Sequence, residues 1–257
     1  MSYPKRIKII GQGRFPKHSV KCTFDNHERE LPDASKRVIE SSWNIFQRSH
    51  AVAYDEELFD VLDFRVSENA IRIIVGVTSY RMFVGTRSRP FVKSFGGASV
   101  PNPLAVRVLT QTKDGKLVFG LRSRWVQTNA NKFDAPAGFV DRSKDWSDHC
   151  PDPYKAAVRE LEEELQVDPK VISDLICIGA IHDSRYEETV LTFECWLDVD
   201  TTLLKPKTSE FEEIHFVSSA NDSVLSFLRA KGRLIAPHCR ESLALWINAD
   251  DRVHEDC

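Results

Sequence analysis

The sequence predicts an α/β (α+β) fold, a sandwich of strands and helices, and two observations support this. Segments with the alternation typical of strands are mixed along the chain with segments of helical periodicity. The 257 residues are 42% hydrophobic and 28% charged, the composition of a globular protein with a core of ordinary size. A typical domain has roughly 150 residues, so we expect one large domain or a domain with an appendage.

Charge and hydropathy exclude several kinds of partner. The 35 Lys and Arg residues against 38 Asp and Glu residues give a net charge of -3, so no basic excess favours a phosphate polymer and we expect no nucleic-acid partner. The apolar run Ile71–Val77 is interrupted by Arg72, so no membrane span is expected. The charged N-terminus (Lys5, Arg6, Lys8) is unlike a signal peptide, and the six cysteines are scattered, which indicates a cytoplasmic, intracellular protein, with the nucleus as a further location.

The first hundred residues predict a polar start followed by a helix and a short sheet. Residues 1–34 are polar and turn-rich. Ser35 is expected to cap a helix that ends near Ser49, because apolar residues recur at helical spacing. Residues 59–84 read as strand, with a turn at Glu68-Asn69, and residues 85–103 read as a long connection rich in Gly and Pro.

From residue 104 the pattern becomes more regular. Strands are expected at 104–112 and 116–122, joined by the hairpin turn Asp114-Gly115. Asp152 and Pro153 predict the start of a helix that runs to about Gln166. Further strands are expected at 175–181 and 190–199, and a C-terminal helix at 218–231 or 241–249.

Three carboxylates gather on one side of the helix predicted at 153–166. Glu160, Glu163 and Glu164 are neighbours at helical spacing, and like charges so placed repel each other. A hard divalent cation, Mg²⁺ with Mn²⁺ as an alternative, would compensate them and would share its coordination shell with substrate phosphates. Arg159 is placed to orient the carboxylates. The alternative interpretation is a solvated acidic helix face.

This segment resembles the signature of the Nudix hydrolase family, Arg-Glu-aliphatic-x-Glu-Glu-x-Gly-aliphatic preceded by a glycine and a glutamate. Arg159–Glu164 match its second half, Val167 its last aliphatic residue and Gly138 its opening glycine. The stretch between Gly138 and Arg159 is seven residues longer than in the signature, Pro151 stands where the glutamate is expected, and Gln166 replaces the late glycine. The resemblance implies a Nudix α/β/α sandwich with an N-terminal β-rich and helical appendage.

Other segments resemble the Nudix branch that cleaves UDP-glucose and UDP-galactose, which has such an appendage and an elongated, degenerate signature. The similarity extends from about residue 35 to residue 247. It implies an appendage over residues 1–100 that contributes to substrate binding and a Nudix domain over residues 101–250. The segments that carry it are Trp43 with its helix, Leu58-Phe59-Asp60, Val77–Thr86 with its distinctive Thr78-Ser79-Tyr80-Arg81, Asn102-Pro103-Leu104 and Phe133–Gly138.

The resemblance also implies roles for individual residues. Glu160 and Glu164 would hold the metal, and Glu163 would be a third ligand or the general base, so that Arg159, Glu163 and Glu164 form the catalytic set. Phe139 stands where the branch can carry a polar contact, which makes a different sugar preference a possibility. The residues that match the branch's substrate contacts are Phe59, Tyr80, Arg122, Gln127, Asp134 and Asp141. The alternative roles are core packing for the two aromatic residues, a surface salt bridge for the arginine and turn capping for the two aspartates.

The expected reaction is Mg²⁺-dependent hydrolysis of the pyrophosphate bond of a small nucleotide sugar to UMP and a sugar 1-phosphate. Two alternatives remain at this stage. One is the same chemistry on ADP-ribose, a dinucleoside polyphosphate or coenzyme A, and the other is a module that binds a nucleotide sugar without cleaving it. The sequence leaves open the oligomeric state, the number of metal ions, the identity of the base and the choice between glucose and galactose.

Overall fold

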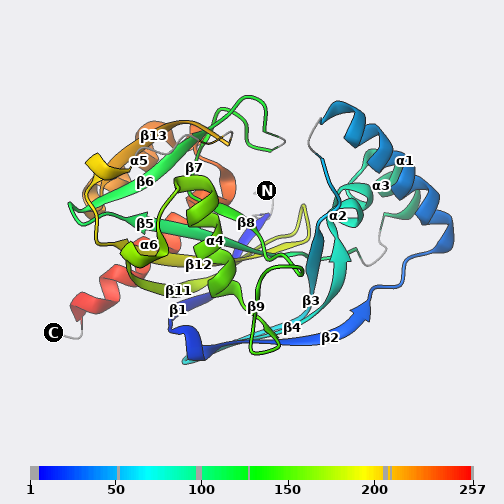
Figure 1. Cartoon of the computed structure of the whole chain (residues 1–257), viewed down its shortest axis with the longest axis horizontal. Helices are drawn as coiled ribbons and strands as arrows, with labels where there is room; N and C mark the ends of the chain where they lie inside the picture. Colours follow the sequence, from blue (N-terminus) through cyan, green and yellow to red (C-terminus); the bar gives the residue numbers. More distant parts are fainter. Residues whose placement is uncertain are drawn as a thin grey trace, which may run out of the picture.

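The computed structural model describes residues 6–50, 53–96, 100–126, 128–204, 208 and 210–255. Two sheets organise the chain (Figure 1). A large mixed sheet lies with α4, α5 and α6, and a small sheet lies beside it with α1, α2 and α3.

The large sheet has the central strand order β1-β11-β12-β5-β6-β13. Only β12 and β5 in this order run parallel, and the short strands β7 and β8 pair with β6 and β5. The strands are β1 (Ile7–Phe15), β5 (Leu104–Gln111), β6 (Lys116–Arg122), β7 (Phe133–Asp134), β8 (Ala137–Phe139), β11 (Ile172–Asp183), β12 (Glu188–Leu197) and β13 (Phe211–Ser218).

Helices cover both faces of this sheet. On one face, Val106 and Val108 of β5 share a core with Leu161 of α4 (Pro153–Leu165). On the other face, Leu109 of β5 shares a second core with Leu243 of α6 (Pro237–Glu255), next to α5 (Asn221–Lys231). The predicted α/β/α sandwich is therefore confirmed, and both C-terminal helices form. Among the described residues, no helix is long and apolar enough to cross a membrane.

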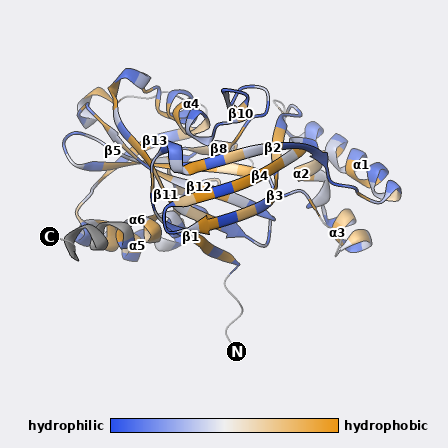
Figure 2. Cartoon of the chain, turned by 90° about the horizontal axis from the view of Figure 1, so that it is seen from below, coloured by the Kyte–Doolittle hydropathy of each residue, from blue (hydrophilic) through white to orange (hydrophobic). Residues whose placement is uncertain are grey.

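The small sheet has the order β2-β4-β3. Its helices α1 and α3 pack against one another and against α2, and hydrophobic residues mark the strands of both sheets more than they mark α1 (Figure 2). The elements are β2 (Val20–Glu28), α1 (Asp33–Ser49), β3 (Glu57–Ser67), β4 (Ala70–Ser79), α2 (Tyr80–Thr86) and α3 (Arg89–Phe95), and a short ribbon of β9 (Trp146–Ser147) and β10 (Cys150–Pro151) lies against β2.

The predicted elements of the first hundred residues need four corrections. Ser35 does not cap the first helix, because α1 begins at Asp33 and the Ser35 hydroxyl donates to the Pro32 carbonyl at 2.7 Å. Residues 1–34 are not merely turn-rich, because they contain β1, which pairs with β11 of the large sheet, and β2. The strand expected at 59–84 ends at Ser79, whose hydroxyl accepts a hydrogen bond from the Met82 amide at 3.4 Å and caps α2. The long connection at 85–103 holds α3, capped by Ser88. A serine hydroxyl thus caps a short helix at each of these two places, where a strand and a connection were predicted.

Arg87 joins the helices of the small sheet to the large sheet. Its Nε donates to the Tyr186 carbonyl at 2.6 Å and its Nη2 to the Glu187 carbonyl at 2.9 Å, both in the turn between β11 and β12. Its Nη2 also donates to the carbonyl of Pro101 at 2.5 Å. Burial lowers the pKa of Arg87 to about 10.

Candidate active site

The local sequence fixes α4 at both ends. The Asp152 carboxylate accepts hydrogen bonds from the amides of Tyr154 and Lys155, at 2.9 and 3.2 Å, and Pro153 occupies the first helical turn. At the other end Gln166 adopts a left-handed conformation with φ of 54°. The helix therefore ends where the family's signature has glycine, and a glutamine takes the backbone conformation that glycine adopts most easily.

The three glutamates of α4 do not point the same way. Glu160 and Glu164 are buried, at 5% and 4% exposure, whereas the Glu163 side chain is 52% exposed. Both buried carboxylates face β8. The Ala137 amide donates to Glu164 Oε2 at 3.3 Å, and a Cβ at Gly138 would lie 2.2 Å from Glu160 Oε1. Gly138 therefore leaves the space that the Glu160 carboxylate occupies.

Arg159 orients this row of carboxylates. Its guanidinium donates to Glu160 Oε1 at 2.6 Å and to Glu163 Oε2 at 3.1 Å. Its Nη2 also donates to the Phe139 carbonyl at 2.9 Å and to the buried Asp145 at 2.8 Å. Asp145 belongs to the extra residues after Gly138, and sequence reasoning missed it. An acidic residue inside that insertion was the available signal.

A second group of charges lies at the other end of the row. Arg122 Nη1 is 2.8 Å from Glu210 Oε1 and 3.8 Å from Asp134 Oδ2, and Arg122 Nε donates to the Thr128 carbonyl at 3.1 Å. Burial, and then the charges of Glu210 and Glu160, raise the pKa of Glu164 well above its usual value. Glu210 was also missed by sequence reasoning, because it lies outside any motif and reaches the site only through the fold.

Aromatic side chains from α1, α2 and β8 gather beside the carboxylates. Tyr80 and Phe83 are stacked with their ring centroids 6.0 Å apart, and Phe139 lies 5.1 Å from Phe83 and 6.1 Å from Tyr80. Trp43 and Phe46 of α1 also pack against Tyr80. Phe139 thus contacts the aromatic group through its ring and Arg159 through its carbonyl oxygen.

Comparison with known proteins decides the family. The model of the NUDIX domain matches residues 101–230, which is just over half of the chain. The chain belongs to the NUDIX domain family. It is therefore a Nudix hydrolase, in a family that typically cleaves the pyrophosphate bond in derivatives of nucleoside diphosphates. Among curated proteins no sequence matches the chain.

Several solved structures resemble this Nudix chain in part. DR0079 from Deinococcus radiodurans is 14% identical, with 68% of this chain and 90% of that chain covered and a TM-score of 0.41. The MutT protein from Methanosarcina mazei Go1 is 21% identical, with 61% and 99% covered and a TM-score of 0.39. An Ap4A hydrolase from C. elegans is 11% identical, with 56% and 98% covered and a TM-score of 0.38. We draw nothing about the substrate from likenesses this distant.

Nudix hydrolases generally use a divalent metal such as Mg²⁺, and the donor set of this chain fits one. Burial raises the pKa of Glu160 to about 7, although Arg159 lowers it, and burial also raises the pKa of Glu164 well above its usual value. Two buried carboxylates on one helical turn carry an electrostatic penalty that a bound cation would remove. In the described part of the chain no three His, Cys, Asp or Glu side chains already form a metal cage. The fit therefore rests on Glu160 and Glu164, with water and substrate oxygens completing the shell.

The remaining predicted substrate residues of the Nudix chain lie at different depths. The Phe59 side chain has no exposed surface and packs against Trp146 and Phe24, with ring centroids 5.2 and 6.0 Å away, so it faces the core and not an open surface. Asp134 is 2% exposed and accepts from Arg107 Nη1 at 2.8 Å. Gln127 lies outside the described residues.

Asp141 stabilises the turn that follows it. Its Oδ1 accepts hydrogen bonds from the Ser143 amide and hydroxyl at 2.7 and 2.6 Å, and Lys144 Nζ lies 3.3 Å from its Oδ2. Burial opposes ionisation, but these partners keep the pKa of Asp141 below its usual value. The turn-capping role that sequence reasoning held as the alternative is thus realised in the structure.

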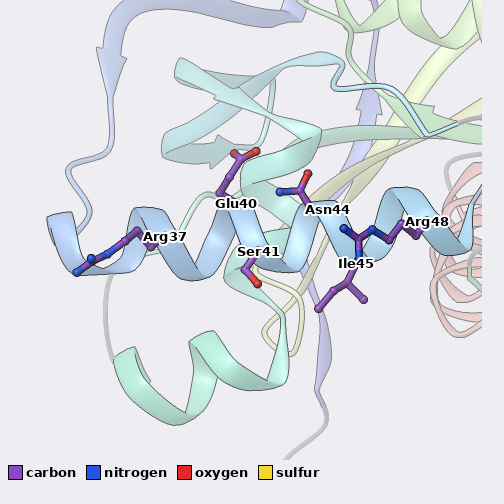
Figure 3. A pocket seen from close by; sticks show the side chains of 6 residues that line it. All are labelled: Arg37, Glu40, Ser41, Asn44, Ile45 and Arg48. Carbon is purple, nitrogen blue, oxygen red and sulfur yellow. The ribbon is translucent and has the colours of Figure 1, made fainter.

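The two described surface hollows lie away from the α4 carboxylates. One, of about 380 Å³, follows one exposed face of α1 and receives side chains from no second element (Figure 3). Its residues are Arg37, Glu40, Ser41, Asn44, Ile45 and Arg48. The other, of about 580 Å³, lies between α3 and the turn joining β11 to β12, where Phe91 and Tyr186 line it. Glu160 and Glu164 line neither hollow and are themselves 5% and 4% exposed.

Proposed function

We propose that this Nudix hydrolase cleaves the pyrophosphate bond of UDP-sugars, UDP-glucose and UDP-galactose, to UMP and a sugar 1-phosphate. One observation carries the proposal. The ring of Phe139 contacts Tyr80 and Phe83 of the appendage, and its carbonyl accepts from Arg159, which in turn holds Glu160. The aromatic group of the appendage and carboxylates suited to a metal-bound diphosphate therefore meet at a single strand, β8, where a nucleotide sugar would contact both.

In the proposed reaction, water adds across the phosphoric anhydride. A new bond forms between the water oxygen and phosphorus, the bond from phosphorus to the bridging oxygen breaks, and a proton leaves the attacking water. When bound, Mg²⁺ would neutralise the charge that develops on the phosphoryl oxygens. Glu160 and Glu164 would hold the cation, and Arg159 keeps the Glu160 carboxylate in place. Glu163, exposed and adjacent, is proposed as a third ligand or as the base that takes the proton.

The substrate contacts are proposed with two adjustments to their expected roles. Because Glu210 already binds its guanidinium, Arg122 would attract the diphosphate through its positive charge and not by a two-pronged hydrogen bond. Asp134 and Asp141, both engaged in internal hydrogen bonds, would act by fixing Arg107 and the turn at 141–144. Tyr80 is proposed as a direct contact from the appendage, residues 1–100, to the Nudix domain at 101–250. Phe59 supports this surface from the core, and Gln127 remains a proposed contact.

Purified protein incubated with UDP-glucose and Mg²⁺, with an EDTA control and mass analysis of the products, tests the proposal. We expect UMP and glucose 1-phosphate that disappear with EDTA. Glu164→Gln should remove turnover and leave the circular dichroism spectrum unchanged, whereas Glu162→Gln, an exposed neighbour on the same helix, should retain it. Normal turnover in Glu164→Gln contradicts the assignment. Cleavage of ADP-ribose, a dinucleoside polyphosphate or coenzyme A in place of UDP-sugars overturns the substrate, and nucleotide-sugar binding without cleavage indicates a binding module.

A further inference from the structure

Trp125 is the most exposed large apolar side chain among the described residues, at 82%. An indole left in water forgoes roughly 25 cal/mol for each Å² of apolar surface that a partner would cover. Most tryptophans of this chain are far less accessible; Trp43 and Trp246, for example, are 4% exposed. The guanidinium carbon Cζ of the neighbouring Arg124 lies 5.7 Å from the centroid of the Trp125 ring, and most of the indole surface is open.

The loop that carries Trp125 has a defined conformation at its base. The Arg122 amide donates to the Lys132 carbonyl at 2.9 Å, and the Asn131 amide donates back to the Arg122 carbonyl at 3.0 Å. The Trp125 amide donates to the Ser123 hydroxyl at 3.3 Å, and Arg122 Nε donates to the Thr128 carbonyl at 3.1 Å. These hydrogen bonds order the backbone on both sides of Trp125, whose indole is exposed.

The base of this loop belongs to the carboxylate site. The Ser123 amide donates to the Glu210 carbonyl at 2.7 Å, and the Glu210 side chain binds Arg122. Arg122 Nη1 also lies 3.8 Å from Oδ2 of the buried Asp134 in β7, the strand that precedes β8. Trp125 follows Arg122 by three residues, so their Cα atoms are at most about 11 Å apart. Figure 1 shows the loop between β6 and β7 extending from the large sheet toward the segment that joins α1 to β3.

The residues predicted to stack on the base are occupied by other rings. Phe59 is wholly buried, and Tyr80 is stacked with Phe83 and contacted by three more aromatic side chains. The row of carboxylates therefore has a packed aromatic group at the Phe139 end and an open indole at the Arg122 end. A nucleobase gains more from an open face than from one already covered.

We propose that Trp125 is a substrate-binding residue whose indole stacks on the nucleobase, so that the nucleotide lies with its base toward Arg122 and its diphosphate along Glu164 and Glu160. This inference rests on the proposed function. It places the group beyond the diphosphate at the Phe139 end, where the resemblance locates sugar preference. Stacking does not depend on the hydrogen-bond donors and acceptors of the base. Trp125 therefore contributes affinity for the base and little discrimination between bases.

Metal-free binding of UDP tests the inference without turnover. In EDTA, UDP should reduce acrylamide quenching of tryptophan fluorescence in the wild-type protein, and inorganic pyrophosphate, which has no base, should not. Trp125→Ala should raise the Kd for UDP by between about 5-fold and 150-fold, the range for loss of one base stack. Trp125→Phe should retain affinity within a few fold and lose the quenching change. Leu203→Ala, which removes another exposed apolar side chain (71%), should bind UDP as the wild type does.

The outcomes separate this inference from the proposed function. If the protein cleaves UDP-glucose but Trp125→Ala keeps the wild-type Kd for UDP, the stacking role is wrong and the proposed function stands. If UDP-glucose is neither bound nor cleaved and ADP protects Trp125 from acrylamide, the stacking role stands and the proposed substrate is wrong. If no nucleotide protects Trp125 in the folded protein, the inference is overturned.

Discussion

The carboxylate of Asp145 accepts two hydrogen bonds from the guanidinium of Arg159, at 3.2 Å from Nε and 2.8 Å from Nη2. Asp145 is fully buried, and its Oδ2 also accepts a hydrogen bond from the Asp141 amide at 2.8 Å. Because the guanidinium is planar and Asp145 binds one edge of it, its remaining N–H groups can reach Glu160 and Glu163 in a single orientation. The insertion after Gly138 thus supplies a carboxylate partner for Arg159, in a chain that has Pro151 at the position of the signature's glutamate.

Asp145→Asn removes the charge and one acceptor and keeps the shape. We expect kcat/KM to fall by about 10- to 100-fold, the usual effect of losing a partner that orients a ligand of the metal. The apparent Mg²⁺ affinity should fall in parallel, which a merely structural role would not require. Asp148→Asn, an exposed aspartate of the same loop, is the control and should leave both quantities unchanged. Equal activity in the two variants contradicts the orienting role.

Gly138→Ala tests the space that holds Glu160. The new Cβ would lie 2.2 Å from Oε1 and 2.5 Å from Cδ, so the carboxylate must move. A displacement of about 1 Å at a reacting centre lowers the rate on the order of 100-fold, and we expect kcat/KM to fall at least that much. Gly232→Ala meets nothing within 4 Å and should have wild-type kinetics. Steady-state assays and urea unfolding of both variants distinguish a lost site from a lost fold.

Gln166→Gly should stabilise the protein. A side chain at φ of 54° carries a steric cost that glycine avoids, and the gain is reduced by the greater freedom of glycine in the unfolded chain. We expect the free energy of unfolding to rise by about 0.5 to 1 kcal/mol. Gln166→Ala keeps the backbone strain and loses the side chain, so a rise in that variant as well would assign the effect to the side chain.

Asp152 makes stability depend on pH in acid. Burial opposes its ionisation, but Lys17 and Ser147 bind the carboxylate at 2.6 Å and keep its pKa below the usual value of 3.8. The ionised form is therefore favoured by folding, and the contribution is present above the unfolded pKa and lost as pH falls through the lower folded pKa.

Asp152→Asn should lower the free energy of unfolding by about 1 kcal/mol at pH 7, because asparagine still caps the helix but carries no charge. The difference from the wild type should shrink as the pH falls below about 4. Urea titrations at several pH values measure it. Asp222→Asn, an exposed residue in the first turn of α5, should show a smaller difference at every pH. A difference that is constant with pH would contradict the charge argument.

The sequence was informative where local rules decide the structure. The hairpin at Asp114-Gly115, with Gly115 at φ of 69°, and the cap at Asp152 both follow from residue types at fixed spacing. The carboxylate partners Asp145 of Arg159 and Glu210 of Arg122 could not be predicted from residue types at fixed spacing. Asp145 and Glu210 are brought to these guanidiniums by tertiary packing, and the second contact spans 88 positions of the chain, which periodicity cannot detect. Phe59 was predicted as a substrate contact, with core packing as the alternative. It is wholly buried, and sequence similarity alone does not tell how deeply a side chain is buried.

The pairing of β1 with β11 has a further consequence for the first hundred residues. The chain leaves the large sheet after Phe15 and rejoins it at Leu104. The small sheet and its helices are therefore inserted between two strands of the large sheet. A protein shortened to begin at residue 101 would expose the full edge of β11, with backbone donors and acceptors ready to pair with another molecule. We therefore expect the Nudix half to be less soluble alone than within the whole chain, because the edge of β11 is covered by residues that the family signature does not contain.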